Sequence, residues 1–125
     1  MANVLYVDAN AFKGLAVAGL LNTLLDTGRQ VIVTTSVRDE LSSSPGRASD
    51  LEAISWINRN IVLGNVREVN TSELGTGAGE LSIRNQILAH PEDNSLAISE
   101  DRVGLNAIFG ATSSVGSPAP VSTLS

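Results

Sequence analysis

The chain has no cysteine, which excludes disulfides and thiolate metal sites and leaves a reducing compartment open to it. The chain has a single histidine, which excludes a histidine-rich zinc site. No Ser-His-Asp triad can be assembled around it. Positive charge is scarce: 8 Lys and Arg stand against 13 Asp and Glu, which argues against a broad basic face for polyanions. No apolar run approaches the roughly 20 residues of a membrane span. Met1–Asn3 lack the charged start of a signal peptide, so we expect a cytoplasmic protein with no membrane partner.

The remaining composition indicates one globular domain. The chain has 125 residues, of which 42% are hydrophobic, enough to bury one core. From Ala111 on, Ser, Gly, Pro and Thr dominate, and prolines cannot donate to the interior of a sheet. We therefore predict a domain over residues 1–110 and a tail over 111–125, in which only 121–124 could form an edge strand.

Short apolar runs alternate with helical patterns along the chain. Val4–Val7 has the composition of a strand buried on both faces, as in the centre of a parallel sheet. Similar runs predict strands over 31–35, 66–69 and 96–99, and helical patterns cover 11–25, 36–42, 49–60, 79–90 and 103–109. This alternation predicts the α/β class with a parallel sheet and right-handed crossovers.

Local signals predict where the helices begin and end. Ser36 followed by Asp39 fits a capping pattern, and Ser49 or Asp50 can cap the next helix. Gly28 is suited to the left-handed residue that follows a helix.

Acidic residues follow the predicted strands. Asp8 comes directly after the first strand, Glu40 lies in the helix after the second, and Glu80 opens the helix that follows a glycine-rich turn. Glu100 and Asp101 come directly after the fourth strand. Because ligands of open α/β sheets bind at the carboxyl ends of the strands, we expect these acids to converge on one site.

Each acid also has a structural interpretation. Asp8 can cap the helix after it, as can Asn10. Glu40 is favoured near a helix amino terminus in any case, and Glu80 can pair with Arg84 one turn later. The sole histidine, His90, precedes a proline at a predicted helix end and has no partner with which to act as a base.

Several carboxylates without cysteine select a hard cation, Mg²⁺ or Mn²⁺. Such an ion polarises a phosphoryl group, activates water and orients an in-line attack. The residues therefore favour a metal-dependent phosphodiesterase.

Four segments, taken in order, resemble the motifs of PIN-domain nucleases. Val7–Phe12 is similar to the opening strand motif, and Val33–Leu41 to the second motif. Gly77–Leu81 resembles the Gly-Glu helix start of one PIN branch, the VapC-like toxins, and Ile98–Arg102 the strand–acid–Asp–Arg segment of that branch. The resemblance covers about residues 3 to 110.

The resemblance implies catalytic and metal-binding roles for Asp8, Glu40, Glu80 and Asp101, with Glu100 as a neighbouring metal ligand. It implies a three-layer α/β/α sandwich with a parallel sheet of four or five strands in the order 3-2-1-4-5. It further implies a Mg²⁺/Mn²⁺-dependent endoribonuclease for single-stranded RNA, which is often the toxin of a toxin–antitoxin pair and often a homodimer. The chain departs from the family in having only one lysine, Lys13, and a Ser/Gly/Pro-rich end.

Substrate contacts need donors near the same edge of the sheet. Asn10 belongs to the first motif, and Arg38, Arg84 and Arg102 lie near Glu40, Glu80 and Asp101 in sequence; these four are the candidates. For each arginine the alternative is a surface ion pair with a neighbouring acid.

Two other functions compete with the nuclease. The first is a non-catalytic PIN-like binding module, against which the filled acid positions argue. The second is another α/β phosphoryl-transfer hydrolase or a phospho-receiver. A haloacid-dehalogenase-type phosphatase needs a second aspartate where Asn10 stands, and a receiver needs a late lysine, whereas none follows Lys13.

Overall fold

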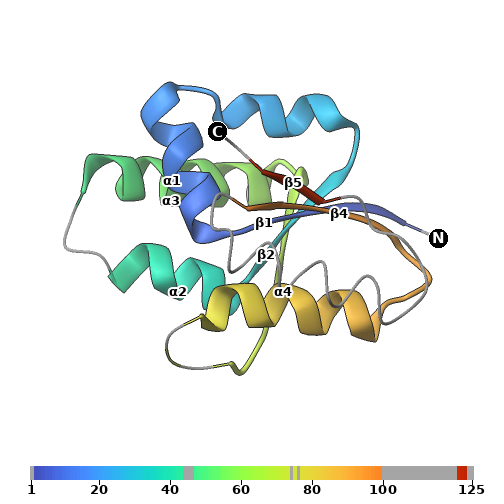
Figure 1. Cartoon of the computed structure of the whole chain (residues 1–125). Coiled ribbons are helices and arrows are strands. Elements are labelled where there is room, and N and C mark those ends of the chain that lie inside the picture. The colour runs from blue at the N-terminus through green and yellow to red at the C-terminus, as the bar shows by residue number, and fades with distance from the viewer. Residues whose placement is uncertain (1, 44–46, 74, 76, 100–120, 124–125) are drawn as a thin grey trace.

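A computed structural model describes residues 2–43, 47–73, 75, 77–99 and 121–123. Its strands form one sheet in the order β3-β2-β1-β4-β5, and every neighbouring pair is parallel (Figure 1). The strands are β1 Asn3–Val7, β2 Gln30–Thr34, β3 Val66–Val69, β4 Asn94–Ser99 and β5 Val121–Thr123. The α/β class with a parallel sheet is thus confirmed, and β5 lies within the predicted edge strand 121–124.

Helices cover both sides of the sheet, with α1 and α3 on one side and α4 on the other (Figure 1). They are α1 Ala9–Ala18, the 3₁₀ helix η1 Leu21–Thr27, α2 Thr35–Ser43, α3 Ala48–Val62 and α4 Ala78–Ala89. The arrangement is consistent with a three-layer sandwich. None of the helices in the described part of the chain has both the length and the apolar character needed to cross a membrane.

The core is built around β1, which has neighbours on both sides in the sheet. All four residues Val4–Val7 are buried, as expected for a central parallel strand. Above β1, the rings of Phe12 in α1 and Trp56 in α3 lie 6.2 Å apart at 52°, joining the two helices of that layer.

The predicted helix over 11–25 is wrong in one respect, because the structure divides it at Gly19. This residue has a φ of 71°, a left-handed conformation that glycine adopts without steric cost. The backbone N–H groups of Gly19 and Leu20 donate to Ala16 and Leu15 and close α1. The second half becomes η1, which ends at Gly28, also at φ 71°, as predicted.

Two predicted caps are also wrong. The hydroxyl oxygen of Thr34, the last residue of β2, accepts from Val37 N–H at 3.2 Å, so Thr34 rather than Ser36 caps α2. Arg47 precedes α3 without a side-chain cap, while Asp50 lies buried in the first turn of that helix. Thr34 holds the cap position of α2 because β2 ends there and α2 begins at the next residue. The predicted helix 103–109 lies outside the described residues.

Candidate functional site

Asp8 lies at the carboxyl end of the central strand and is 1% exposed. It caps α1, where one carboxylate oxygen, Oδ1, accepts from Ala11 N–H at 2.7 Å. The other oxygen, Oδ2, accepts from the hydroxyl of Ser99 at 2.6 Å. The capping role considered for Asp8 is therefore confirmed, and the residue also has a partner on the neighbouring strand β4.

Ser99 was not among the site residues predicted from the sequence. This residue is fully buried at the end of β4, and β4 lies beside β1 with Val7 opposite Ile98. The signal that could have found it is its position: a hydroxyl in the last place of an apolar strand, at the edge where Asp8 was expected.

A second buried polar network lies at the same edge. Thr34 at the end of β2 and Ser82 in α4 have their hydroxyl oxygens 2.6 Å apart, and Ser82 also donates to the carbonyl of Gly79 at 2.6 Å. Both side chains are at most 1% exposed. The network ties the end of β2 to the first turns of α4, where Glu80 lies.

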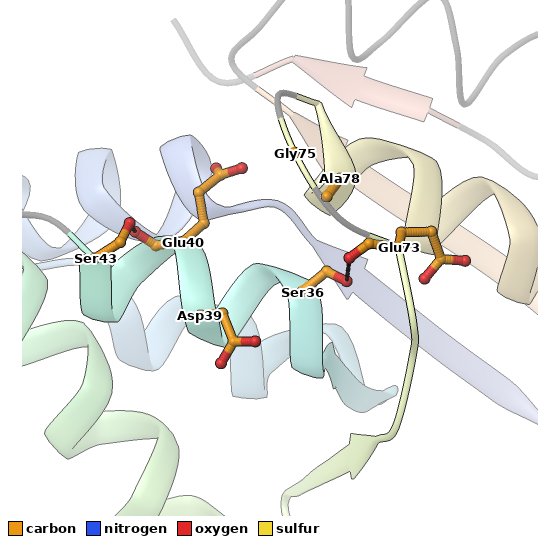
Figure 2. A pocket seen from close by; sticks show the side chains of 7 residues that line it. All are labelled: Ser36, Asp39, Glu40, Ser43, Glu73, Gly75 and Ala78. Carbon is orange, nitrogen blue, oxygen red and sulfur yellow. Dashed lines mark hydrogen bonds between the residues drawn. The ribbon is translucent and has the colours of Figure 1, made fainter.

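Glu40 lies where α2 and α4 pack together. A methyl group added at Gly79 would be 3.4 Å from Glu40 Oε1 and 3.4 Å from Val37 Cγ2, so the first turn of α4 packs close to the Glu40 carboxylate. Figure 2 shows Glu40 and Asp39 leaving α2 in opposite directions, with Glu40 on the side of the turn that precedes α4. Of these two neighbouring acids, Glu40 is the one directed towards that turn.

A hollow of about 220 Å³ opens beside Glu40 (Figure 2). The residues that line it come from α2 and from the segment before α4: Ser36, Asp39, Glu40, Ser43, Glu73, Gly75 and Ala78. Glu73 was missed in the sequence because it follows no strand directly. The side-chain amide of Asn85 donates to it at 2.7 Å and is the main cause that lowers the pKa of the Glu73 carboxyl below its usual value. Glu73 is therefore a further anionic group near Glu40.

Glu80 lies in the first turn of α4 and is half-buried. The glycines before it make the turn, since Gly75 and Gly77 have φ values of 87° and 79°. Ile83 and Ile87, which share a helical face with Glu80, are both buried in the core.

The described acids are not close enough for all of them to hold one ion directly. Within the described ranges, Asp8, Glu40 and Glu80 do not form a group whose ligand atoms all lie within 4.8 Å of one another. Glu100, Asp101 and Arg102 lie outside the described residues. Carboxylates at such separations can share only a hydrated ion, which binds one of them directly and the others through water, as Mg²⁺ commonly does.

The candidate substrate residues differ in their surroundings. The guanidinium of Arg38 donates to Glu68 Oε1 at 2.7 Å and to Asn58, so the ion-pair alternative holds for this arginine. Arg84 is half-buried in α4, and its Nε–H is buried with no acceptor within the described part of the chain. Asn10 is half-buried in the first turn of α1.

Among the described residues, three acidic or imidazole side chains do lie close together. They are at the amino end of β4, away from Asp8. Ligand atoms of His90, Glu92 and Asp93 lie within 4.8 Å of one another, immediately before β4. His90 Nδ1 is 3.3 Å from Glu92 Oε1, and Asp93 accepts from the backbone of Ala2. These contacts join the turn to the start of the chain, at the opposite end of β4 from Ser99.

No family model and no curated protein matches the sequence. Among solved structures, the chain is similar to a domain of a functionally unknown protein from Methanocaldococcus jannaschii DSM 2661. The two share 18% identity over 99% of this chain and 92% of the other, with a TM-score of 0.58. At this identity the likeness shows a shared fold alone.

Proposed function

We propose that this protein is a metal-dependent endoribonuclease of the PIN kind, which hydrolyses phosphodiester bonds in single-stranded RNA. The observation that carries the proposal is the buried carboxylate of Asp8 at the carboxyl end of the central strand, with a hydrogen-bond donor on each oxygen. A buried carboxylate is costly unless it is hydrogen-bonded, paired or bound to a metal. Its place is the edge where open parallel sheets bind ligands.

The donors at this edge suit a hard cation. They are carboxylate oxygens, and Mg²⁺ or Mn²⁺ would bind one of Asp8, Glu40 and Glu80 directly and the others through water. The bound ion supplies charge stabilisation for the phosphoryl oxygens and an activated water. The Ala11 N–H and the Ser99 hydroxyl hold the Asp8 carboxylate, and the Glu40 side chain is directed towards the turn before α4 (Figure 2).

Glu73 and Asp39 line the same hollow as Glu40 and add to the negative charge of this part of the surface. A polyanionic substrate can approach such a site only where a cation offsets the charge, which is a further reason to expect a divalent ion there. Arg84 in α4 is the candidate for a direct phosphate contact among the described arginines. The roles of toxin, antitoxin partner and homodimer rest on the family resemblance and form part of the proposal.

The test is cleavage of an end-labelled single-stranded RNA by purified protein with Mn²⁺, with and without EDTA. We expect cleavage that EDTA abolishes and that Asp8→Asn lowers at least 100-fold, since the substitution removes a metal-binding charge with little change of shape. The matched control is Asp26→Asn, an exposed aspartate of η1 before the amino end of β2.

Two results would favour one of the alternative functions over a nuclease. RNA binding without cleavage at any divalent ion would favour a binding module. Metal-dependent hydrolysis of a phosphomonoester, with no cut in RNA, would favour another phosphoryl-transfer hydrolase.

A further inference from the structure

We infer that His90, Glu92 and Asp93 form a second metal site, for a transition ion such as Zn²⁺, at the amino end of β4. Their ligand atoms, one from each side chain, all lie within 4.8 Å of one another. The group comes immediately before the first residue of β4, whereas Asp8 is bonded to the last residue of that strand. The site is therefore separate from the proposed active site, and the inference does not depend on the proposed function.

The separation of two of the ligand atoms fits an ion of this kind. Zn²⁺ binds imidazole nitrogen and carboxylate oxygen at about 2.0–2.2 Å in tetrahedral geometry, which puts two ligand atoms about 3.3–3.6 Å apart. His90 Nδ1 and Glu92 Oε1 are 3.3 Å apart. The same distance also fits a direct ion pair between the two side chains, so the experiment must separate a metal site from a surface ion pair.

The turn that carries the three side chains is fixed by its backbone. Asp93 N–H donates to the carbonyl of His90 at 3.1 Å, and Pro91, which follows His90, has its own φ fixed at about −65°. Asn94 N–H then donates to the carbonyl of Ala2 at 2.8 Å, which joins the turn to the start of the chain. Because the turn is already folded, metal binding has to order only the side chains, which lowers its entropic cost.

Asp93 has the kind of outer contact that metal-binding carboxylates have. Its Oδ1 accepts from the backbone N–H of Ala2 at 3.2 Å, and the carboxylate keeps further lone pairs for an ion. A donor of this kind orients a ligand towards the metal. The side chains of His90 and Glu92 are 49% and 62% exposed, so water can complete the coordination of an ion that they hold.

The donor set selects a transition ion rather than Mg²⁺. An imidazole nitrogen suits Zn²⁺, Ni²⁺ and Cu²⁺, whereas Mg²⁺ takes oxygen ligands in octahedral geometry. His90 is the only histidine, so no other part of the chain can offer an imidazole together with two carboxylates. The two ends of β4 should therefore prefer different ions, with a nitrogen-containing site beside Asn94 and an all-oxygen site beside Asp8.

The experiment titrates Zn²⁺ into the full chain at about pH 8, where ligands are deprotonated, and follows the histidine ring C–H resonances by NMR. These resonances report on His90 alone, because there is no second histidine. We expect them to change and to saturate as one Zn²⁺ binds. Calorimetry on Asp8→Asn protein, which lacks the active-site acid, then measures the Zn²⁺ affinity of the turn. His90→Gln and Glu92→Gln should each lower it about 10-fold or more, since loss of an outer partner alone can cost that much.

Two further variants sharpen the test. Asp93→Asn keeps an oxygen for the Ala2 N–H but removes the charge, and it should weaken Zn²⁺ binding as the other two substitutions do. The matched control is Asp26→Asn, which removes an exposed carboxylate of η1 and should leave the Zn²⁺ affinity unchanged. Histidine resonances that do not respond to Zn²⁺, or equal Zn²⁺ affinity with and without His90→Gln, would show a surface ion pair only and overturn the inference. Neither result would change the proposed function, which the cleavage assay with Asp8→Asn tests separately.

Discussion

Thr34 and Ser82 form a hydrogen bond whose direction the structure fixes. Their hydroxyl oxygens are 2.6 Å apart, and Ser82 donates its own hydrogen to the carbonyl of Gly79. Thr34 must therefore donate to Ser82, and its oxygen accepts from Val37 N–H in α2. One threonine thus joins β2 to the starts of both helices that carry Glu40 and Glu80.

Replacing this threonine should destabilise the protein. Thr34→Val keeps the shape but removes the cap of α2 and the donor to Ser82, so we expect a loss of about 1–2 kcal/mol in the free energy of unfolding. Urea unfolding followed by circular dichroism measures it. Thr34→Ser retains the hydroxyl and serves as the control. Equal stability of the two variants would show that the network contributes nothing.

Lys13 in α1 and Asp50 in α3 form an ion pair. We expect removal of the lysine alone to destabilise the protein more than removal of both charges. Their charged atoms are 4.0 Å apart, and Asp50 is buried with no hydrogen-bond partner for either oxygen within the described residues. Lys13→Met should cost about 1–3 kcal/mol, because it removes a positive charge beside a buried carboxylate. Asp50→Asn in the same chain should restore most of that loss. If the double variant is no more stable than Lys13→Met in urea, the carboxylate does not depend on the lysine.

The two described candidate arginines should differ in their effect on RNA. Measured across a salt series on Asp8→Asn protein, Arg84→Gln should lower the salt slope of binding by about 0.7, as one lost phosphate contact on a single strand predicts. Arg38→Gln should leave the slope nearly unchanged, since its guanidinium is already bound to Glu68 and Asn58.

The matched control for both arginines is Arg59→Gln, an exposed arginine in the last turn of α3. Arg29 is less suitable as a control, because it donates to the carbonyls of Val4 and Asn94 at the amino edge of the sheet. A slope for Arg84→Gln that matches Arg59→Gln would remove Arg84 from the RNA contacts.

Tyr6 should give the protein a specific sensitivity to alkali. Burial in β1 is the main cause that raises the pKa of its phenol to about 12, with Asp93 adding to the effect. The pKa of Tyr6 in the folded state lies above the unfolded value of about 10. The neutral phenol therefore stabilises the folded state fully below about pH 10, and this stabilisation is lost as the pH rises towards about 12. It amounts to about 2–3 kcal/mol in all. Tyr6 is the only tyrosine, so tyrosinate absorbance reports on it alone.

The expected result is that tyrosinate appears together with loss of the native circular dichroism signal. Tyr6→Phe should show a shallower fall of stability between about pH 10 and about pH 12. Tyrosinate formation near pH 10 in a protein that is still folded would contradict the burial argument.

Sequence patterns of short range predicted the main elements well. The apolar run Val4–Val7 is a buried central strand and Gly28 ends a helix, both as predicted. These features depend on residues only a few positions apart. The spacing of apolar side chains and the backbone preferences of single residues therefore reveal them in the sequence. The errors of this kind are the helix across Gly19, where the chain stops at a left-handed glycine, and the caps predicted for α2 and α3.

The sequence by itself determined the class of the fold, the place of Asp8 at a strand end, and the types of ligand that the chain can offer. Only the tertiary structure decided that Ser99 donates to Asp8 and that Thr34 links α2 to α4. It also decided that Glu73 and Glu40 line one hollow and that Arg38 pairs with Glu68. The first of these contacts joins residues 91 positions apart. Such contacts depend on which strands become neighbours and in what register, and the register follows from packing the whole core rather than from any local pattern.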